Sequence, residues 1–261
     1  MEILFIGDIV GRPGRECVYT LLPDLIDEYG IDFVIANGEN VTHGKGLSKE
    51  HMLEMLENGV DAITLGNHSF AKKDIFTYID DYEEVIRPYN LHDVFPGRGT
   101  SVFEVEGKTI RVTNLLGRVY MGMNVENPFD SLNEIVENGE KTDIHIVDFH
   151  AEATGEKMAL GWAMDGKVTA VLGTHTHIQT NDARVLTNGT AYISDVGMCG
   201  PRNGILGCEK EGVIKKTWTG YPSTFEVLDE NETVFSAVVI TVDEVTNKVR
   251  KITPIQKNIN L

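Results

Sequence analysis

The chain has 261 residues, of which 41% are hydrophobic and 24% are charged, a composition typical of a soluble globular protein with a sizeable core. Its formal net charge of −17 excludes a nucleic-acid-binding surface that is basic as a whole, so any bound phosphate must be held by local cations. The three cysteines have no CxxC spacing, and the sequence shows neither a signal peptide nor a membrane-spanning run. We therefore expect a cytoplasmic protein.

The first part of the chain alternates short apolar runs with helical patterns. Runs rich in β-branched residues predict strands at residues 3–6, 33–36 and 62–65. Residues 14–28 carry a helical apolar stripe that Pro23 is expected to kink or divide. Ser48 is placed to cap a second helix over residues 48–58. This alternation of strands and helices predicts a parallel sheet with helices on both faces.

Strand signals dominate the rest of the chain. A tight turn at Glu106-Gly107 predicts a hairpin within residues 101–116, and Asn188-Gly189 predicts another within residues 183–193. Further strands are expected at residues 144–149 and 168–172, with a final antiparallel pair within residues 236–255.

Residues 197–223 form the least regular stretch, which is rich in glycine and lysine and is either a surface loop or a lid near a site. No repeat, low-complexity tract or long linker interrupts the chain. We expect a single domain over residues 1–261, an α/β sandwich with two mixed central sheets flanked by helices.

Five of the predicted strands end in carboxylate, amide or imidazole side chains. The residues at these ends are Asp8, Asn37, Glu39, Asn40, Asn67, His68, His150, His175 and His177. Functional sites in open α/β sheets gather at the carboxyl ends of the strands. A single strand end with such side chains would be explained by an ordinary turn, because Asp, Asn and Gly are favoured in turns. Five together indicate a shared site.

The residue types at these ends predict a metal site. Carboxylate, amide and imidazole ligands without a thiolate suit manganese, iron, zinc or cobalt. Seven candidate ligands around a central carboxylate exceed what one ion needs, so we expect two ions, about 3.5–4 Å apart, that clamp an in-line displacement at phosphorus. His175 and His177 alone would not decide this, because two histidines can be neighbours in a polar loop by chance. Because the other strand ends supply further ligands, His175 and His177 can each bind one ion.

The motifs at the strand ends are, in chain order, "GD", "NGEN", "GNH", a lone histidine at position 150, and "GTHTH". Together they resemble the calcineurin-like metallophosphoesterases. The resemblance runs over essentially the whole chain. It is highly specific for the metal site and far less specific for the substrate.

The motifs depart from the common pattern of that superfamily in several places. Val10 stands where the usual D-x-H motif has its histidine, and Asn40 would fill the vacant place. Glu39 replaces the usual carboxylate of the second motif, and Ser69 follows "GNH" where Asp or Glu is common. These departures, with "GDIVGRPGR" and "ISDVGMCGP", are similar to the bacterial 2′,3′-cyclic-nucleotide 2′-phosphodiesterase branch.

The resemblance implies a role for each strand-end residue. One ion would be held by Asp8, Glu39, Asn40 and His177, and the other by Glu39, Asn67, His150 and His175. Glu39 would bridge the two ions, which we expect to be iron or manganese. A metal-bridging hydroxide would be the nucleophile. His68, next to a ligand, would be the general acid that protonates the leaving oxygen.

The remaining polar candidates are weaker. His43, shortly after Asn40, is a candidate substrate contact, and Arg12 and Arg202 are the arginines best placed to meet a phosphate. We expect structural roles for His51, His92 and His145, and we expect Cys199 and Cys208 to take no part in the chemistry.

We expect a phosphodiesterase that opens 2′,3′-cyclic nucleotides to nucleoside 3′-phosphates. Its partner would be a small phosphodiester substrate, with weak discrimination among bases and no stable binding to duplex nucleic acid or membrane. The alternatives are a broad-specificity phosphodiesterase or phosphomonoesterase and, in a different class, a metal-bound signalling module without turnover. The sequence leaves open the native metal and the oligomeric state, including a homo-oligomer.

Overall fold

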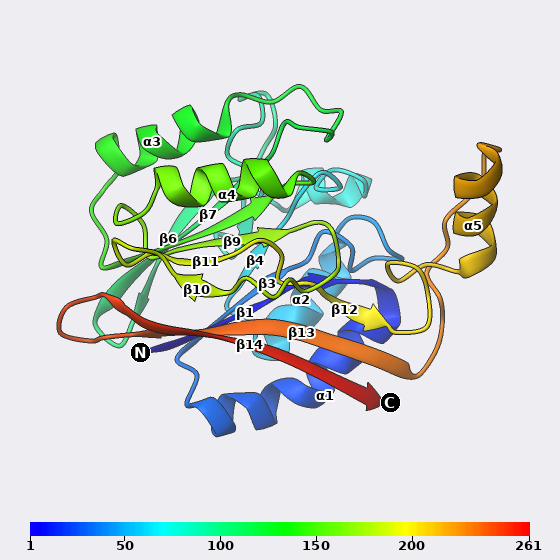
Figure 1. Cartoon of the computed structure of the whole chain (residues 1–261), viewed down its shortest axis with the longest axis horizontal. Helices are drawn as coiled ribbons and strands as arrows, with labels where there is room; N and C mark the ends of the chain where they lie inside the picture. The colour runs from blue at the N-terminus through cyan, green and yellow to red at the C-terminus, as the bar shows by residue number, and fades with distance from the viewer.

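The computed structural model describes residues 1–261 and stacks two mixed β-sheets face to face between helices (Figure 1). In the first, eight-stranded sheet the strand order is β2 (Asp8–Ile9), β12 (Met198–Pro201), β13 (Glu232–Val242), β1 (Glu2–Ile6), β3 (Phe33–Asn37), β4 (Ala62–Thr64) and β5 (Val85–Ile86), with β14 (Val249–Asn260) paired to β13. In the second, six-stranded sheet it is β10 (Arg184–Val185), β11 (Ala191–Ile193), β9 (Ala170–Thr174), β8 (Ile144–His150), β7 (Lys108–Leu116) and β6 (Thr100–Val105). The predicted α/β sandwich of two mixed sheets is confirmed.

Each sheet is built around parallel strands. In the first sheet β1, β3, β4 and β5 run parallel, and in the second β7, β8, β9 and β11 do. The antiparallel strands lie outside these cores, as β13 does beside β1. Since the carboxyl ends of parallel strands share one edge, each sheet delivers its strand-end side chains to a single place.

The apolar core between the sheets explains the unbroken hydrophobic runs in the strands. Ile3 and Phe5 of β1 face the second sheet, where Ile146 of β8 belongs to the same buried cluster. The intervening residues Leu4 and Ile6 point to the opposite face, because side chains alternate along a strand. Strands buried on both faces need apolar residues at every position.

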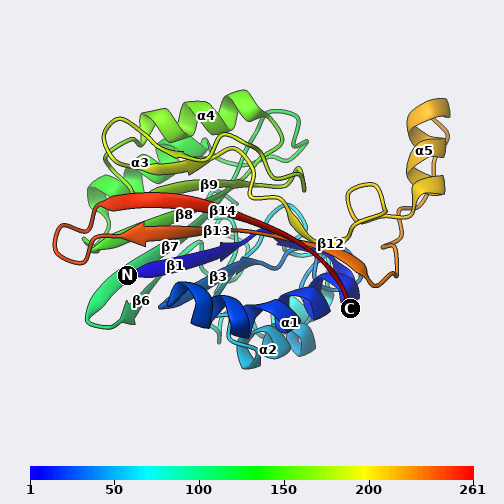
Figure 2. The ribbon, with the colours of Figure 1, turned by 60° about the horizontal axis from the view of Figure 1, so that its bottom comes forward.

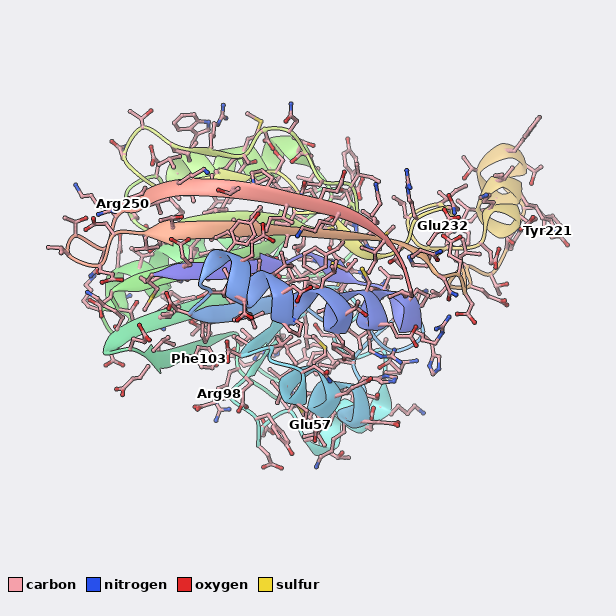
Figure 3. The ribbon with its side chains drawn as sticks, turned by 90° about the horizontal axis from the view of Figure 1, so that it is seen from below. Glu57, Arg98, Phe103, Tyr221, Glu232 and Arg250 are labelled. Atoms are coloured by element: carbon pink, nitrogen blue, oxygen red, sulfur yellow. The ribbon has the colours of Figure 1, made fainter.

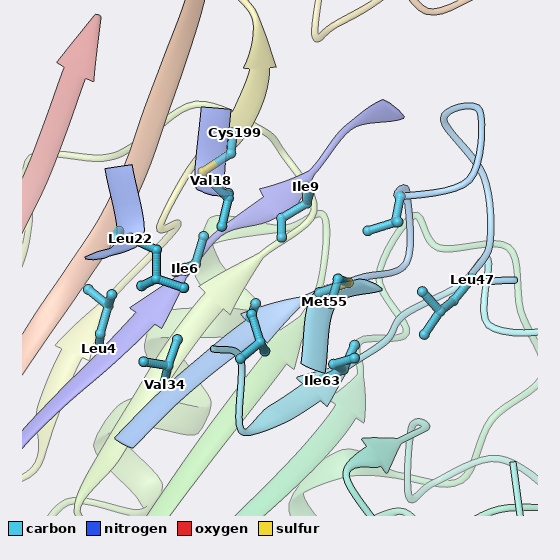
Figure 4. Packing of buried hydrophobic residues seen from close by; sticks show 14 of the residues in the cluster. Leu4, Ile6, Ile9, Val18, Leu22, Val34, Leu47, Met55, Ile63 and Cys199 are labelled. Atoms are coloured by element: carbon cyan, nitrogen blue, oxygen red, sulfur yellow. The ribbon is translucent and has the colours of Figure 1, made fainter. Parts of the chain in front are cut away.

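Helices cover the two outer faces (Figures 1 and 2). Helices α1 (Gly11–Tyr29) and α2 (Lys49–Glu57) pack on the first sheet, and Figure 4 shows Val18 and Leu22 of α1 near Leu4 and Ile6. Helices α3 (Pro128–Asn138) and α4 (Thr154–Ala163) pack on the second sheet through Leu132 and Leu160. A short 3-10 helix, η1 (Lys73–Thr77), follows β4.

Helix α5 (Lys210–Thr219) stands apart from both sheets and has no buried residue. Figure 3 shows Tyr221, just after this helix, at the outer end of the projection. The stretch 197–223 therefore contains a strand and a helix that the sequence did not predict.

The predicted turns and the predicted helix cap are confirmed, whereas the prediction for Pro23 is not. Both turn-defined hairpins form, and Ser48 caps α2 by accepting a hydrogen bond from the backbone N–H of His51. Pro23, which was expected to kink or divide the first helix, does not divide it, because α1 runs unbroken over Gly11–Tyr29. Leu22 and Leu25 on either side of Pro23 are buried in the core, and this packing holds the helix together across the missing N–H. No helix combines the length and the hydropathy that crossing a membrane would require.

Candidate metal centre

All seven predicted metal ligands meet at one edge of the molecule, where strands of both sheets end. Side-chain contacts of 3.0–3.4 Å link them without a break. They are Asp8, Glu39, Asn40, Asn67, His150, His175 and His177. The packing of the two sheets thus joins residues as distant in sequence as Asp8 and His175, which are 167 positions apart.

One half of the cluster is centred on Nε2 of His150. This atom lies 3.1 Å from Glu39 Oε1, 3.0 Å from Asn67 Oδ1 and 3.0 Å from His175 Nδ1. Burial acts to lower the pKa of His150, but the charges of Glu39 and then Asp8 raise it to about 9. A single proton on His150 cannot satisfy three acceptors at once, whereas a divalent cation in its place could. The donor set therefore fits a metal ion.

The other half of the cluster is centred on the amide of Asn40. Its Nδ2 lies 3.4 Å from Asp8 Oδ1, 3.3 Å from His177 Nε2 and 3.2 Å from Glu39 Oε1. To bind an ion, Asn40 would turn its amide by about 180° and present its oxygen. Glu39 Oε1 thus contacts both halves, which is the position a bridging carboxylate needs. Burial acts to raise the pKa of Glu39, but His150 and then His68 lower it to about 2, so this carboxylate is ionised.

Hydrogen bonds with neighbouring residues orient two of the imidazoles. Nδ1 of His177 donates to the carbonyl of Leu206 over 3.0 Å, which leaves Nε2 free to accept or to bind. Nδ1 of His150 lies 2.9 Å from Thr174 Oγ1, which in turn donates to Asp148 over 2.7 Å. Asp148 is fully buried, and burial raises its pKa to about 6. These hydrogen bonds set which ring nitrogen of His150 and of His177 faces the cluster.

The loop that carries His175 and His177 is strained and firmly held. Both residues have positive φ, 101° and 67°, a region that favours glycine. Asp195 Oδ2 accepts from the backbone N–H of Thr176 at 2.9 Å and from its hydroxyl at 2.8 Å. Lys157 Nζ, also buried, donates to the same oxygen at 2.8 Å. The buried ion pair of Lys157 and Asp195 therefore holds Thr176, the residue between the two histidines, in place.

Gly66, just before Asn67, leaves room for two of the ligands. A Cβ at this position would collide with Glu39 Oε2 and lie 2.6 Å from His150 Nε2. Only glycine lets the end of β4 approach both side chains so closely.

His68 lies at the edge of the cluster. Its backbone N–H donates to Glu39 Oε2 over 3.0 Å, and its Nε2 is 3.3 Å from Asn67 Nδ2. Burial lowers the pKa of its imidazole. The side chain lines the cavity above the ligands, where it can reach a bound molecule.

The cavity over the cluster has a volume of about 680 Å³. The lining includes Glu39, Asn40, His175 and His177 on the cluster side, together with His68. The segment around helix α5, residues 206–228, also contributes to the lining, through Leu206, Cys208, Lys216, Ser223, Thr224, Phe225 and Val227. The site is thus a pocket of a size common for small-molecule ligands.

The chain matches the family described as YmdB-like protein over residues 4–255. It belongs to this family. It is 47% identical over 253 residues to a Bacillus subtilis protein named 2′,3′-cyclic-nucleotide 2′-phosphodiesterase, an alignment that covers 97% of this chain and 95% of the relative.

Two solved structures of similar chains have the same fold. A protein from Mycoplasma pneumoniae described as a novel phosphatase has a TM-score of 0.95 and 40% identity, covering 100% of this chain and 94% of that one. A hypothetical protein from Thermus thermophilus has a TM-score of 0.93 and 39% identity, covering 99% of both chains. This YmdB-like chain has the metallophosphoesterase fold and is a phosphoesterase. Its metallophosphoesterase-like relatives imply bound divalent metal ions, and Glu39, His150 and His175 lie close enough together to hold one.

The weaker candidates divide between the cavity and the surface. His43 lines the cavity, and so does Cys208, which was expected to take no part in the chemistry. Arg12 instead pairs with Asp229 at 2.9 Å, outside the cavity lining. Arg202 is exposed and does not line the cavity either.

The other histidines and Cys199 have structural contacts, as predicted. His145 is buried and lies 2.9 Å from Thr113 Oγ1, and His51 Nδ1 lies 2.8 Å from Thr42 Oγ1. Nδ1 of His92 accepts a hydrogen bond from the backbone N–H two residues later, and Cys199 is fully buried.

Three further polar residues belong to the site and are not among the candidates predicted from the sequence. Asp195 follows β11, so the strand-end rule that found the ligands would also have found it. Glu152 follows β8, and its Oε2 lies 3.2 Å from His175 Nε2. Lys157 has no comparable signal, because a lysine in a helical pattern is ordinarily solvated.

Proposed function

We propose that this YmdB-like chain hydrolyses 2′,3′-cyclic nucleotides to nucleoside 3′-phosphates at a centre of two metal ions, iron or manganese. The main support is the two-sided cluster, in which one carboxylate, Glu39, contacts both an imidazole-rich half and an amide-rich half. The name of the Bacillus subtilis relative supports the substrate class. We also propose that residues 1–261 form one cytoplasmic domain whose partner is a small phosphodiester.

The ligands would divide as the contacts suggest. Asp8, Asn40 and His177 would hold one ion with Glu39, and Asn67, His150 and His175 would complete the other. When bound, the two ions would supply a Lewis acid and a water-derived nucleophile that is active at neutral pH.

His68 would protonate the 2′ oxygen as it leaves phosphorus. Its imidazole lines the cavity without belonging to either half of the cluster, and its backbone is tied to Glu39. Burial lowers its pKa in the free protein, but an anionic phosphate beside the ring would favour the protonated form. A positioned acid of this kind contributes about 10²–10⁴-fold to the rate.

The decisive test is the identity of the product. Purified protein loaded with iron or manganese is incubated with 2′,3′-cyclic adenosine and cytidine monophosphates, and the products are separated by chromatography. We expect the nucleoside 3′-phosphate from both substrates, at similar rates. A 2′-phosphate product, or no turnover beside fast hydrolysis of a simple phosphomonoester, would refute the proposal in favour of a phosphomonoesterase.

A further inference from the structure

The projecting segment, residues 206–228, is closed at its base by backbone hydrogen bonds between its own two ends, and we call it the arm. Leu228 N–H donates to the carbonyl of Gly207 over 3.0 Å, and Glu209 N–H donates to that of Glu226 over 2.8 Å. Val227 packs against Gly44 of the body so closely that a Cβ on this glycine would lie 2.5 Å from its methyl group. The root of the arm therefore has a defined place beside the cavity, although α5 itself is exposed.

Within the arm, α5 holds one aromatic ring against the cavity. Gly212 lies against the carbonyl of Thr224, where a Cβ would come within 2.5 Å of the oxygen. One turn further along the same face of α5, Lys216 places its Nζ 4.8 Å from the centroid of the Phe225 ring. Phe225 lines the cavity and is 43% exposed. The ring is thus held from its helix side and remains open to a ligand.

The lining of the cavity combines two kinds of surface. The cluster contributes acidic and imidazole groups, and the arm contributes the apolar side chains of Phe225, Leu206 and Val227. Two lysines, Lys45 and Lys216, add positive charge to the lining of a chain whose net charge is −17. A ligand that matches this lining carries both an anionic phosphate and a flat apolar group. Nucleotides have this chemistry.

We propose that Phe225 forms a binding subsite for the nucleobase, which stacks on its ring while the phosphate reaches the metal cluster. The inference rests on the proposed function, because it takes the ligand to be a nucleotide. Stacking on an aromatic ring accepts any base, since every base has a π-face. The subsite therefore raises affinity for nucleotides over other phosphodiesters without selecting among the four bases.

The test compares substrates with and without a base. The variants are Phe225→Ala and Phe225→Tyr, and the matched control is Trp218→Ala, which removes an 85% exposed aromatic from the same arm outside the cavity. The substrates are 2′,3′-cyclic adenosine monophosphate and methyl riboside 2,3-cyclic phosphate, which has the same reacting group and no base. Circular dichroism of each variant checks that the fold is retained.

For Phe225→Ala we expect KM for the cyclic nucleotide to rise about tenfold with kcat nearly unchanged. This change equals about 1.4 kcal/mol and lies at the lower end of base–aromatic stacking. The base-free substrate should be unaffected, Phe225→Tyr should restore the nucleotide KM, and Trp218→Ala should match the wild type. Equal losses on both substrates, or no change with the nucleotide, would overturn the subsite.

A binding measurement separates this inference from the proposed function. Calorimetric titration with adenosine 3′-phosphate should show about tenfold weaker binding to Phe225→Ala than to the wild type. If cyclic nucleotides are not cleaved but this difference persists, the proposed reaction fails and the base subsite stands. If they are cleaved and the difference is absent, the subsite fails and the reaction stands.

Discussion

The buried ion pair behind the histidine loop gives a sharp prediction for Lys157→Met. Lys157 is 2% exposed, and its Nζ donates to Asp195 Oδ2 and to the carbonyl of Thr174, each at 2.8 Å. Methionine nearly fills the same space but leaves the buried carboxylate of Asp195 without its cation. Removing one partner of a buried ion pair costs about 3–5 kcal/mol.

We expect the lower end of that range, about 3 kcal/mol. Asp195 keeps three donors, which are the N–H and hydroxyl of Thr176 and the N–H of Gly197. The carbonyl of Thr174 also accepts from the N–H of Ala151, so it is not left unpaired. At about 2–4 °C per kcal/mol for a chain of this size, the melting temperature should fall by about 10 °C.

The assay is urea unfolding of the metal-free protein in EDTA, followed by circular dichroism. Lys167→Met, which removes an exposed lysine, is the matched control and should change stability by less than about 0.5 kcal/mol. The double variant Lys157→Met with Asp195→Asn should lose less than the sum of the two single losses, because neither charge is then left alone. Additive losses, or a Lys157→Met protein as stable as the control, would show that the pair does not hold the loop.

Two further predictions concern the cluster and the acid. Gly66→Ala should reduce the metal content from about two ions per chain and abolish turnover, because its Cβ would collide with Glu39. The control Gly155→Ala, whose Cβ meets no atom within 4 Å, should keep its metal content and its turnover. Elemental analysis of the two variants measures the metal content. Unchanged metal content in Gly66→Ala would contradict the close packing of this end of β4. His68→Ala should keep its metal and lose about 10²-fold or more in kcat on cyclic nucleotides, but much less on nitrophenyl esters, whose leaving group needs little protonation. Equal losses on both kinds of substrate would remove His68 from the acid role.

Local sequence signals were sufficient for most strands and for the types of ligand. Turn dipeptides such as Asn188-Gly189 predicted hairpins because their backbone preferences are intrinsic to the residues. The strand-end rule found the ligands because parallel strands direct their carboxyl ends to one edge, whatever the rest of the fold does. Helices α3 and α4 are not predicted, although Asn127 caps α3 and Pro128 occupies its first turn, so local signals for α3 were present.

Only the tertiary structure decided which of these elements meet. Asp8 and His175 come together because two sheets pack face to face, and no local pattern encodes that contact. Lys157 becomes a buried partner of Asp195 only because α4 packs on the second sheet with Lys157 beside the end of β9. Phe225 reaches the cavity because of backbone hydrogen bonds at the root of the arm, in a segment whose composition is typical of a surface loop. Residue type and spacing therefore determine what chemistry a segment offers, whereas the burial of distant surfaces against one another determines where that chemistry is assembled.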